Sequence, residues 1–314
     1  MSWCAWQKFC LKYDSIELIT DPDMYLLFEK SIRGGLSQIS HRYAEVKDSD
    51  KDFITYLDAN ALYSHAMMQY LPVGGFEWSN PDEWTKEKIL SIGDKDEIGY
   101  LFEVDLTYNQ FDENNQLDET KTKALMDLHN GYCLAPESMI IKNEMLNKFQ
   151  TENRNDNTKI SKLTTNFFDK LNYGVSYRTL KLYLELGLTL KKVHRVVKYI
   201  QKPIMEKYIE HNTRLRQDPN NSDFEKDFFK LLNNAIFGKS MENVRNRINF
   251  RLIDNEDSFN RITSNIKKIT EFCGDSEEDI EMLGVHLVKK QTLLNKPIFL
   301  GHLLLRLNSI LYCV

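Results

Sequence analysis

The sequence predicts a mixed α/β protein in which strands and short helices are interrupted by one long helical hairpin. Segments with strand character, bounded by turn residues, recur along the chain at 53–57, at 99–108, within 159–177 and at 190–199. Two long amphipathic segments, joined by the polar turn 217–221, predict an antiparallel pair of helices over about 203–243. The 314 residues can bury a large core, in one large domain or two to three subdomains.

The composition is that of an ordinary globular protein, with 42% hydrophobic residues, 28% charged residues and a net charge of -5. This charge gives no general basic signature, so nucleic-acid binding would need a local basic face. The five cysteines lack the spacing of a zinc site, which favours free thiols in a reducing compartment. The first ten residues lack the apolar core of a signal peptide, and polar residues interrupt the apolar tail 298–314. We therefore expect a soluble intracellular protein without a membrane partner, and the composition leaves nucleus and cytoplasm open.

The first fifty residues are predicted to form short helical or irregular pieces that end at Arg33-Gly34-Gly35. Two glycines permit backbone conformations or close approaches that a side chain would forbid. A turn is the simpler interpretation of this stretch. The alternative is that a backbone amide and the arginine contact a phosphodiester.

A buried strand is predicted over 53–57, followed by a helix that starts within 58–63 and ends before Pro72. Asp58 would then lie between the strand and the helix. An aspartate at this position is a good helix N-cap. Alternatively, a carboxylate at the end of a strand can hold a divalent cation and the phosphates that it carries.

The central part of the chain predicts a strand over 99–108, an acidic loop over 112–118 and a strand that ends at 173–177. The loop does not fit a calcium-binding EF-hand, because Leu117 occupies the glycine position. A short helix over 178–185 should end at Gly187, and a strand with a basic side should follow over 190–199.

The hairpin begins with a helix from Pro203 to about Arg216, and Ser222 should cap a second helix that runs to about Asn243. One face of the second helix predicts core packing, through the apolar stripe Phe224, Phe228, Leu231, Leu232 and Ala235. A second face carries, at helical spacing, Lys230, Asn234, Phe237 and Met241. This second row could pack on another helix, or it could hold a phosphate at one end and a flat ring at the other.

After the hairpin, a strand is predicted over 244–253 with Arg245, Arg247 and Arg251 on one face. This basic row is either a solvated face or a surface that follows a nucleic-acid backbone. Two short strands are expected within 285–300, and an apolar helix is expected to begin near Gly301.

Three stretches resemble the motifs of family B DNA polymerases. The first, Asp58-Ala59-Asn60-Ala61-Leu62-Tyr63, is similar to the motif D-x-x-S-L-Y at the end of a palm strand. The second, Lys230 to Gly238, is similar to K-x-x-x-N-S-x-Y-G on a fingers helix, and Arg33-Gly34-Gly35 resembles the Y-x-G-G element. The resemblance covers nearly the whole chain and is greatest to the protein-primed branch of viruses, mobile elements and organellar plasmids.

The resemblance implies a polymerase palm with a mostly antiparallel sheet and α-helical fingers. A leading segment would occupy 1–50, the palm 51–202 and 244–314, and the fingers 203–243, with the palm incomplete at the C-terminus. The implied reaction transfers a nucleotide from a deoxynucleoside triphosphate (dNTP) to a primer 3′-hydroxyl, with two Mg²⁺ or Mn²⁺ ions. Implied partners are the template-primer DNA, the dNTP and, in this branch, a terminal protein that serves as primer.

The resemblance also implies roles for individual residues. Asp58 and the carbonyl of Ala59 would hold the metals, and Tyr63 would lie under the sugar and clash with a 2′-hydroxyl. Lys230 would neutralise triphosphate charge, and Arg214 would make a second phosphate contact. The remaining nucleotide-binding residues would be Leu62, Asn234, Phe237 and Gly238. The DNA-binding residues would be Arg33, Gly34, Gly35, Arg245 and Arg247.

The chain departs from the family pattern at several positions. Ala61 and Ala235 replace serines, and Phe237 replaces a tyrosine. The third motif, Asp-Thr-Asp, does not follow Lys230, and no exonuclease motifs precede Met1. We therefore expect a polymerase fragment that is inactive as an isolated chain. One alternative is a catalytically dead mobile-element remnant that at most binds nucleic acid, and another is a structural α/β protein with accidental matches.

Overall fold

The computed structural model describes residues 2–10, 15–36, 39, 43–47, 51–55, 57–152, 161–262, 266–273, 280–288 and 291–313. These residues fall into two compact units. The first unit combines Met1–Met241 with Pro297–Val314, and the second is Glu242–Lys296. The mixed α/β class predicted from the sequence is confirmed.

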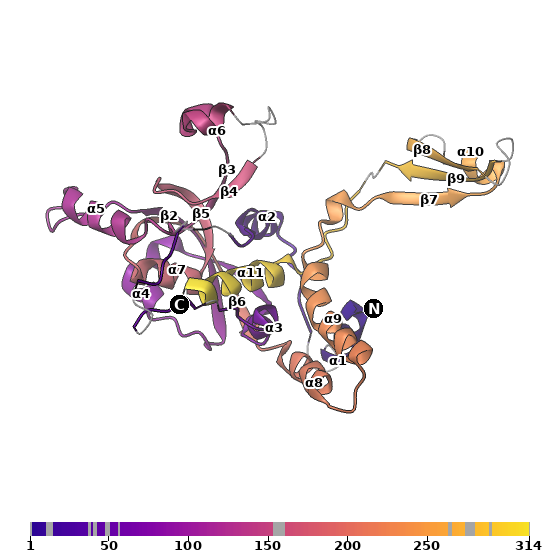
Figure 1. Cartoon of the computed structure of the whole chain (residues 1–314). Coiled ribbons are helices and arrows are strands. Elements are labelled where there is room, and N and C mark those ends of the chain that lie inside the picture. Colours follow the sequence, from indigo (N-terminus) through magenta and orange to yellow (C-terminus); the bar gives the residue numbers. More distant parts are fainter. Residues whose placement is uncertain are drawn as a thin grey trace. The chain divides into compact units, whose positions relative to one another are not determined.

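The first unit is built on a four-stranded antiparallel sheet with the order β1-β6-β2-β5 (Figure 1). Its strands are β1 (Leu71–Ser79), β6 (Thr189–Lys202), β2 (Ile98–Thr107) and β5 (Lys170–Ser176). The predicted strands at 99–108 and 190–199 and the predicted strand end at 173–177 are confirmed. Strand β1 was not predicted, because Pro72 and the glycines after it were interpreted as the end of a helix. It lies at the edge of the sheet, where a proline costs no hydrogen bond in the middle of a ladder.

Strands β2, β5 and β6 and the helices next to them share a large apolar core. Helix α7 (Tyr177–Glu185) buries most of its side chains there, and α4 (Lys86–Leu90) adds Ile89. Gly187 ends α7 with φ +103°, a conformation that favours glycine, so the predicted helix end is confirmed. Helix α5 (Glu119–Leu128) follows the predicted acidic loop, and Asp118 caps it. Helix η1 (Pro81–Glu83) connects β1 to α4.

Helix α11 (Ile298–Cys313) contacts α2 (Pro22–Ser31), α3 (Leu62–Met67) and β1. The rings of Phe28, Phe76 and Phe299 meet there with centroids 4.8 to 6.1 Å apart. Helix α11 begins three residues before the predicted start, with Pro297 just ahead of it. Gly301 is required by close packing, because a Cβ atom at this position would lie 1.7 Å from Cγ of Met241.

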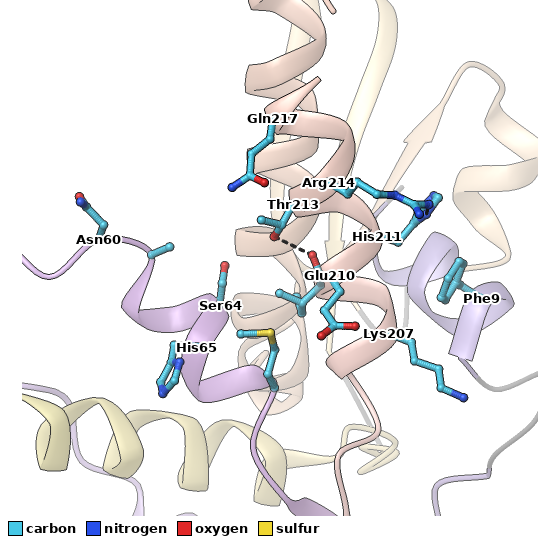
Figure 2. Close-up of a pocket in the computed structure, with 13 residues that line it drawn as sticks. Phe9, Asn60, Ser64, His65, Lys207, Glu210, His211, Thr213, Arg214 and Gln217 are labelled. Atoms are coloured by element: carbon cyan, nitrogen blue, oxygen red, sulfur yellow. Dashed lines mark hydrogen bonds between the residues drawn. The ribbon is translucent and has the colours of Figure 1, made fainter. Parts of the chain in front are cut away.

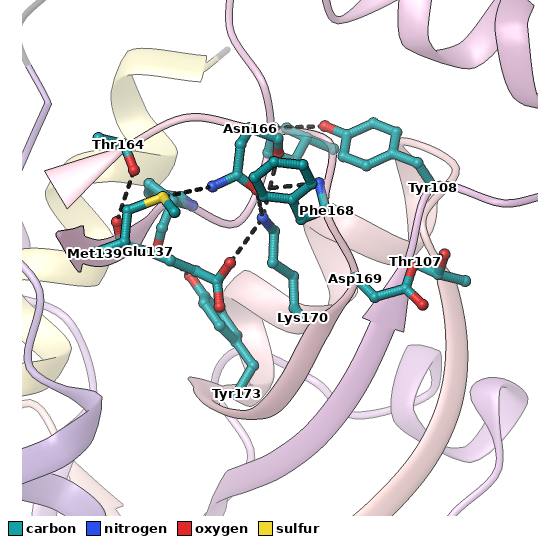
Figure 3. Close-up of polar contacts among 12 residues, drawn as sticks. Thr107, Tyr108, Glu137, Met139, Thr164, Asn166, Phe168, Asp169, Lys170 and Tyr173 are labelled. Carbon is teal, nitrogen blue, oxygen red and sulfur yellow. Dashed lines mark hydrogen bonds and ion pairs between the residues drawn. The ribbon is translucent and has the colours of Figure 1, made fainter. Parts of the chain in front are cut away.

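A two-stranded ribbon, β3 (Glu137–Ile140) with β4 (Ser161–Thr164), is joined to the main sheet by a buried lysine (Figure 3). The Lys170 ammonium donates to Glu137 Oε2 at 3.0 Å and to both oxygens of Asn166. The hydroxyl of Tyr173 donates to the carbonyl of Pro136 at 3.1 Å. The ammonium thus has three acceptors, which indicates a structural anchor. Along the chain, η2 (Asn143–Met145) and α6 (Lys148–Glu152) lie between β3 and β4.

The predicted helical hairpin is confirmed as α8 (Glu206–Gln217) and α9 (Asp223–Ser240), with α1 (Ser2–Cys10) packed against both. Ser222 caps α9 in a capping box, in which its hydroxyl and the carboxylate of Glu225 bond reciprocally to backbone amides. The predicted apolar stripe is wrong in part, because Phe224 is 80% exposed and Leu231 is 59% exposed. The face of α9 that is buried carries Leu232, Asn233, Ile236 and Ser240.

The second unit is a three-stranded antiparallel sheet with the order β7-β9-β8. It contains η3 (Val244–Asn246), β7 (Asn249–Ile253), α10 (Glu256–Asn260), β8 (Ile266–Cys273) and β9 (Ile280–Leu287). Only the second half of the predicted strand 244–253 forms a strand. Its first half contains a helical turn, which Asn243 caps and which includes Arg245. The prediction of two strands within 285–300 is wrong, since β9 ends at Leu287 and residues 291–297 form no strand.

No helix among the described residues combines the length and the apolar character needed to cross a bilayer.

Candidate functional site

The segment that carries the first motif is an exposed loop rather than a buried strand. Phe53 and Leu57 are each 84% exposed, and no strand is assigned to the described residues of 51–61. Tyr56, within the predicted strand, lies outside the described residues. An apolar run becomes a strand only beside a partner strand, and the order of the four-stranded sheet contains no place for this segment. The prediction of a buried strand ending at Asp58 is therefore wrong.

Helix α3 begins at Leu62, so Asp58 is not its N-cap. The N-cap is Ala61, which has φ 54° and provides no side-chain oxygen to the first turn. A left-handed alanine is uncommon and costs of order 1–3 kcal/mol, and such strain is enriched at functional sites. Asp58, Ala59 and Asn60 lie exposed in the loop immediately before this strained residue.

The second motif lies on α9, where Lys230 and Asn234 are exposed and Phe237 is half-buried. The rings of Phe237 and Tyr63 are in contact, with centroids 4.9 Å apart and planes inclined by 51°. This contact joins the two predicted motifs, which are far apart in the sequence. Gly238 faces open space, since a Cβ atom there would have no neighbour within 4 Å.

A buried pair of amides fixes how α9 is turned toward α8. Asn212 Nδ2 donates to Asn233 Oδ1 at 2.9 Å, and both residues are almost fully buried between the helices. Asn233 therefore faces α8. Around the helix, Phe237 lies about 40°, Lys230 about 60° and Asn234 about 100° from Asn233. This pair was not predicted from the sequence, although two adjacent asparagines inside an apolar helical pattern were a visible signal.

A cavity of about 790 Å³ lies between α3 and α8 and reaches Phe9 of α1 (Figure 2). From the first motif it is lined by Asn60 and Ala61, and from α3 by Ser64, His65 and Met68. Helix α8 contributes a face that includes Lys207, Glu210 and Arg214. Lys230, Asn234 and Phe237 are not among the lining residues, so the cavity borders the first motif without reaching the second-motif row.

Arg214 points away from the first motif. Figure 2 shows its guanidinium on the side of α8 that faces Phe9, with Asn60 on the opposite side. Its Nη2 lies 3.5 Å from Nδ1 of His211. The implied contact between Arg214 and the triphosphate stays a prediction, and it would require the side chain to turn.

Arg33 binds to the protein itself. Its Nη1 donates to the carbonyl of Gly174 at 2.7 Å, and its guanidinium lies 3.9 Å from the centroid of the Tyr173 ring. Gly34 and Gly35 have negative or extended backbone φ and open space where a Cβ would be. Neither glycine is therefore required by the fold as described, and the predicted contact of all three residues with DNA stays a prediction.

Two of the basic residues of the second unit, Arg245 and Arg247, form hydrogen bonds within that unit. Arg247 forms two hydrogen bonds of 2.7 Å to the carboxylate of Glu242, and this hydrogen bonding raises the pKa of the guanidinium. The backbone amide of Arg245 donates to the side chain of Asn243. Arg245 and Arg247 lie in and just after the η3 turn, so they do not form one strand face with Arg251.

The predicted metal ligands supply one carboxylate, from Asp58, and one carbonyl, from Ala59. In the part of the chain that the structure describes, no group of three His, Cys, Asp or Glu residues could hold a metal ion. Two Mg²⁺ ions require several carboxylate oxygens arranged around them. The described residues therefore do not make a complete two-metal site.

Solved structures with a similar fold include those of Phi29 DNA polymerase. Its binary complex with primer-template DNA has a TM-score of 0.50 and 13% sequence identity, and the match covers 97% of this chain and 42% of that chain. An orthorhombic crystal form gives a TM-score of 0.49, with 13% identity over 97% of this chain and 42% of that one. The ternary complex with primer-template DNA and incoming nucleotides gives 0.46, with 14% identity over 96% and 42%.

The chain thus spans less than half of the length of these polymerases. Protein-family models and curated protein sequences give no match. Phi29 DNA polymerase is a protein-primed family B polymerase, so the structural comparison agrees with the family that the motifs resemble. At this identity the comparison shows the fold: mixed α/β, with antiparallel sheets, like that of a polymerase.

Proposed function

We propose that this chain is the palm and fingers part of a DNA-directed DNA polymerase of the protein-primed family B type, and that it binds a dNTP between α3 and α9. The observation that carries the proposal is the contact between Tyr63 and Phe237, which joins the two motifs on a polymerase-like fold. The strained Ala61, the exposed Lys230 and Asn234, and the open space beside Gly238 support it.

In this proposal the residues around the two rings bind and orient the nucleotide. Tyr63 and Phe237 form an apolar platform for the sugar and base, and Asn234 provides an amide for hydrogen bonding. Lys230 lies one turn before Asn234 on α9 and neutralises the triphosphate. Asp58 and Ala59 contribute ligands for the Mg²⁺ that accompanies the triphosphate. Template-primer DNA and a terminal protein primer are the further partners of the whole enzyme.

Equilibrium binding of a fluorescent dNTP in the presence of Mg²⁺ tests this proposal. Replacing Lys230 by Ala removes a charge-assisted contact of about 1.5–3 kcal/mol, so we expect the Kd to rise tenfold or more. Lys192→Ala, which removes an exposed lysine on β6, is the matched control. Equal affinities for the Lys230 variant, the control variant and the original protein would refute nucleotide binding at α9.

A second candidate function is nucleic-acid binding by a mobile-element remnant without polymerase chemistry. It is favoured by the incomplete metal ligand set of the described residues. Loss of one metal site should cost several kcal/mol of barrier, or about three orders of magnitude in rate. We therefore expect no primer extension by the isolated chain with Mg²⁺ or Mn²⁺. Extension that disappears in Asp58→Ala would show that the chain is a complete polymerase.

A further inference from the structure

One side of the hairpin combines cations with an exposed phenylalanine ring and a half-buried histidine ring. Lys207, His211 and Arg214 follow at i, i+4 and i+7 on α8, so they share one face within an arc of about 60°. Phe9, at the end of α1, lies next to this face, and all four residues line the 790 Å³ cavity. Figure 2 shows them together on one side of α8. We call these four residues the cation–aromatic patch.

Among the described residues, no carboxylate forms an ion pair with the cations of the patch. Elsewhere in the same unit, Arg195 pairs with Glu103 at 2.6 Å and Lys198 pairs with Glu77 at 2.8 Å. Within the described part of the chain, Lys207 has no ion-pair partner, and the contact of the Arg214 side chain is with the His211 ring. Glu210 is the one carboxylate among the described lining residues. The patch therefore carries a local positive charge although the whole chain is acidic.

The rings of the patch are stacked and partly open to solvent. Phe9 is 40% exposed, and its ring stacks on that of His211 with centroids 5.3 Å apart and planes inclined by 28°. The ring of Tyr208, which belongs to the hairpin, packs edge-on against the Phe9 ring with centroids 5.5 Å apart and holds it in place. An aromatic ring held rigidly at a surface can stack on a flat ligand at little entropic cost.

This combination fits single-stranded nucleic acid better than a duplex. A single strand offers unpaired bases for stacking and phosphates for cations, whereas the base faces of a duplex are already stacked. Lys207 and Arg214 are about 10.5 Å apart along α8, so they can reach different phosphates of one strand. Each neutralised phosphate would make the affinity salt-dependent.

We propose that the cation–aromatic patch binds single-stranded DNA, with a base on Phe9 and His211 and phosphates on Lys207 and Arg214. The choice of DNA over RNA rests on the proposed polymerase function. The patch lies on α1 and α8, while the proposed nucleotide contacts lie on α3 and α9. It thus provides a separate contact for a strand that is not yet paired.

Fluorescence anisotropy of a labelled oligo(dT) of about 12 nucleotides, with the full chain at several salt concentrations, tests the patch. Lys207→Gln/Arg214→Gln removes both cations. Lys86→Gln/Lys192→Gln is the matched control, because it removes two exposed lysines that line a different cavity of about 420 Å³. Phe9→Leu removes the aromatic face and keeps an apolar contact with Tyr208. Far-ultraviolet circular dichroism checks that each variant is folded.

We expect the Lys207/Arg214 variant to lower the affinity at least tenfold and to reduce the slope of log K against log salt by about 1.4. Phe9→Leu should lower the affinity about tenfold with an unchanged slope. Equal slopes and affinities for the Lys207/Arg214 and Lys86/Lys192 variants would overturn the proposal. Tighter binding of a duplex than of oligo(dT) would overturn the assignment to single strands, and tighter binding of oligo(rU) would overturn the choice of DNA.

The result is independent of dNTP binding, which is measured separately with Lys230→Ala. Oligonucleotide binding that depends on the patch, together with failed dNTP binding, would support the patch and refute the proposed function. The reverse combination would support the proposed function and refute the patch.

Discussion

Replacing Asn233 by Leu should destabilise the helical hairpin, because it leaves the amide of Asn212 buried without its partner. The two amides are 3% and 6% exposed and are joined by a hydrogen bond of 2.9 Å. An unsatisfied buried amide costs about 1–3 kcal/mol, so the free energy of unfolding should fall by that amount. The double change Asn212→Leu/Asn233→Leu removes both amides, and its free energy of unfolding should return to within about 1 kcal/mol of the original.

Urea unfolding followed by tryptophan fluorescence measures this effect. All four tryptophans, Trp3, Trp6, Trp78 and Trp84, belong to the unit that contains the hairpin, so the signal reports that unit. Asn234→Leu is the control, since it changes the same residue type at the next, exposed position and should have an effect of about 0.5 kcal/mol or less. If Asn233→Leu is as stable as Asn234→Leu, the buried amide pair does not hold the helices together as we infer.

Three further predictions concern the first unit. Burial opposes ionisation of Glu103, but the hydrogen bond and charge of Arg195, together with Lys30, outweigh it and lower the pKa of the carboxylate. The stabilising contribution of Glu103 is present at neutral pH and is lost as the pH falls below 4.5, the ordinary pKa of a glutamate. On going from neutral to acidic pH, the Tm of Glu103→Gln should therefore fall less than the Tm of the original protein. Gly174→Ala would place a methyl group 1.8 Å from Oγ of Ser31 and should lower the stability by about 1–3 kcal/mol in thermal melts, whereas Gly34→Ala, into open space, should have little effect. Lys170→Met removes the anchor of the β3-β4 ribbon, so limited proteolysis should cleave the ribbon faster than in the original protein, and an unchanged cleavage rate would argue against the anchor.

The features that could be predicted from the sequence depend on local chemistry. The capping box of Ser222 and Glu225, the glycine end of α7 and the strand character of β2 and β6 are each specified by neighbouring residues. The two motifs were identified by resemblance, and the contact of Tyr63 with Phe237 brings them together in the structure. How their other residues act on a substrate remains a proposal.

The features that could not be predicted depend on distant partners. Phe53 and Leu57 have strand character, but a strand forms only where another strand presents free backbone groups. The outer stripe of α9 looked like a core face, yet the buried amide pair turns Asn233 rather than Phe224 toward α8. Strand β1 was hidden by Pro72, which an edge position tolerates. Periodicity alone could not reveal which neighbour each face would meet.

Photolabelling tests the central claim, that Tyr63 and α9 form one nucleotide site, most directly. The full chain is irradiated with an azido-dATP in Mg²⁺, and the labelled residues are located by mass spectrometry of its peptides. We predict labelling of the peptides that carry Tyr63 and Phe237, and protection of both by excess unmodified dNTP. Labelling confined to other peptides, or labelling of these two that excess dNTP does not suppress, would contradict the account.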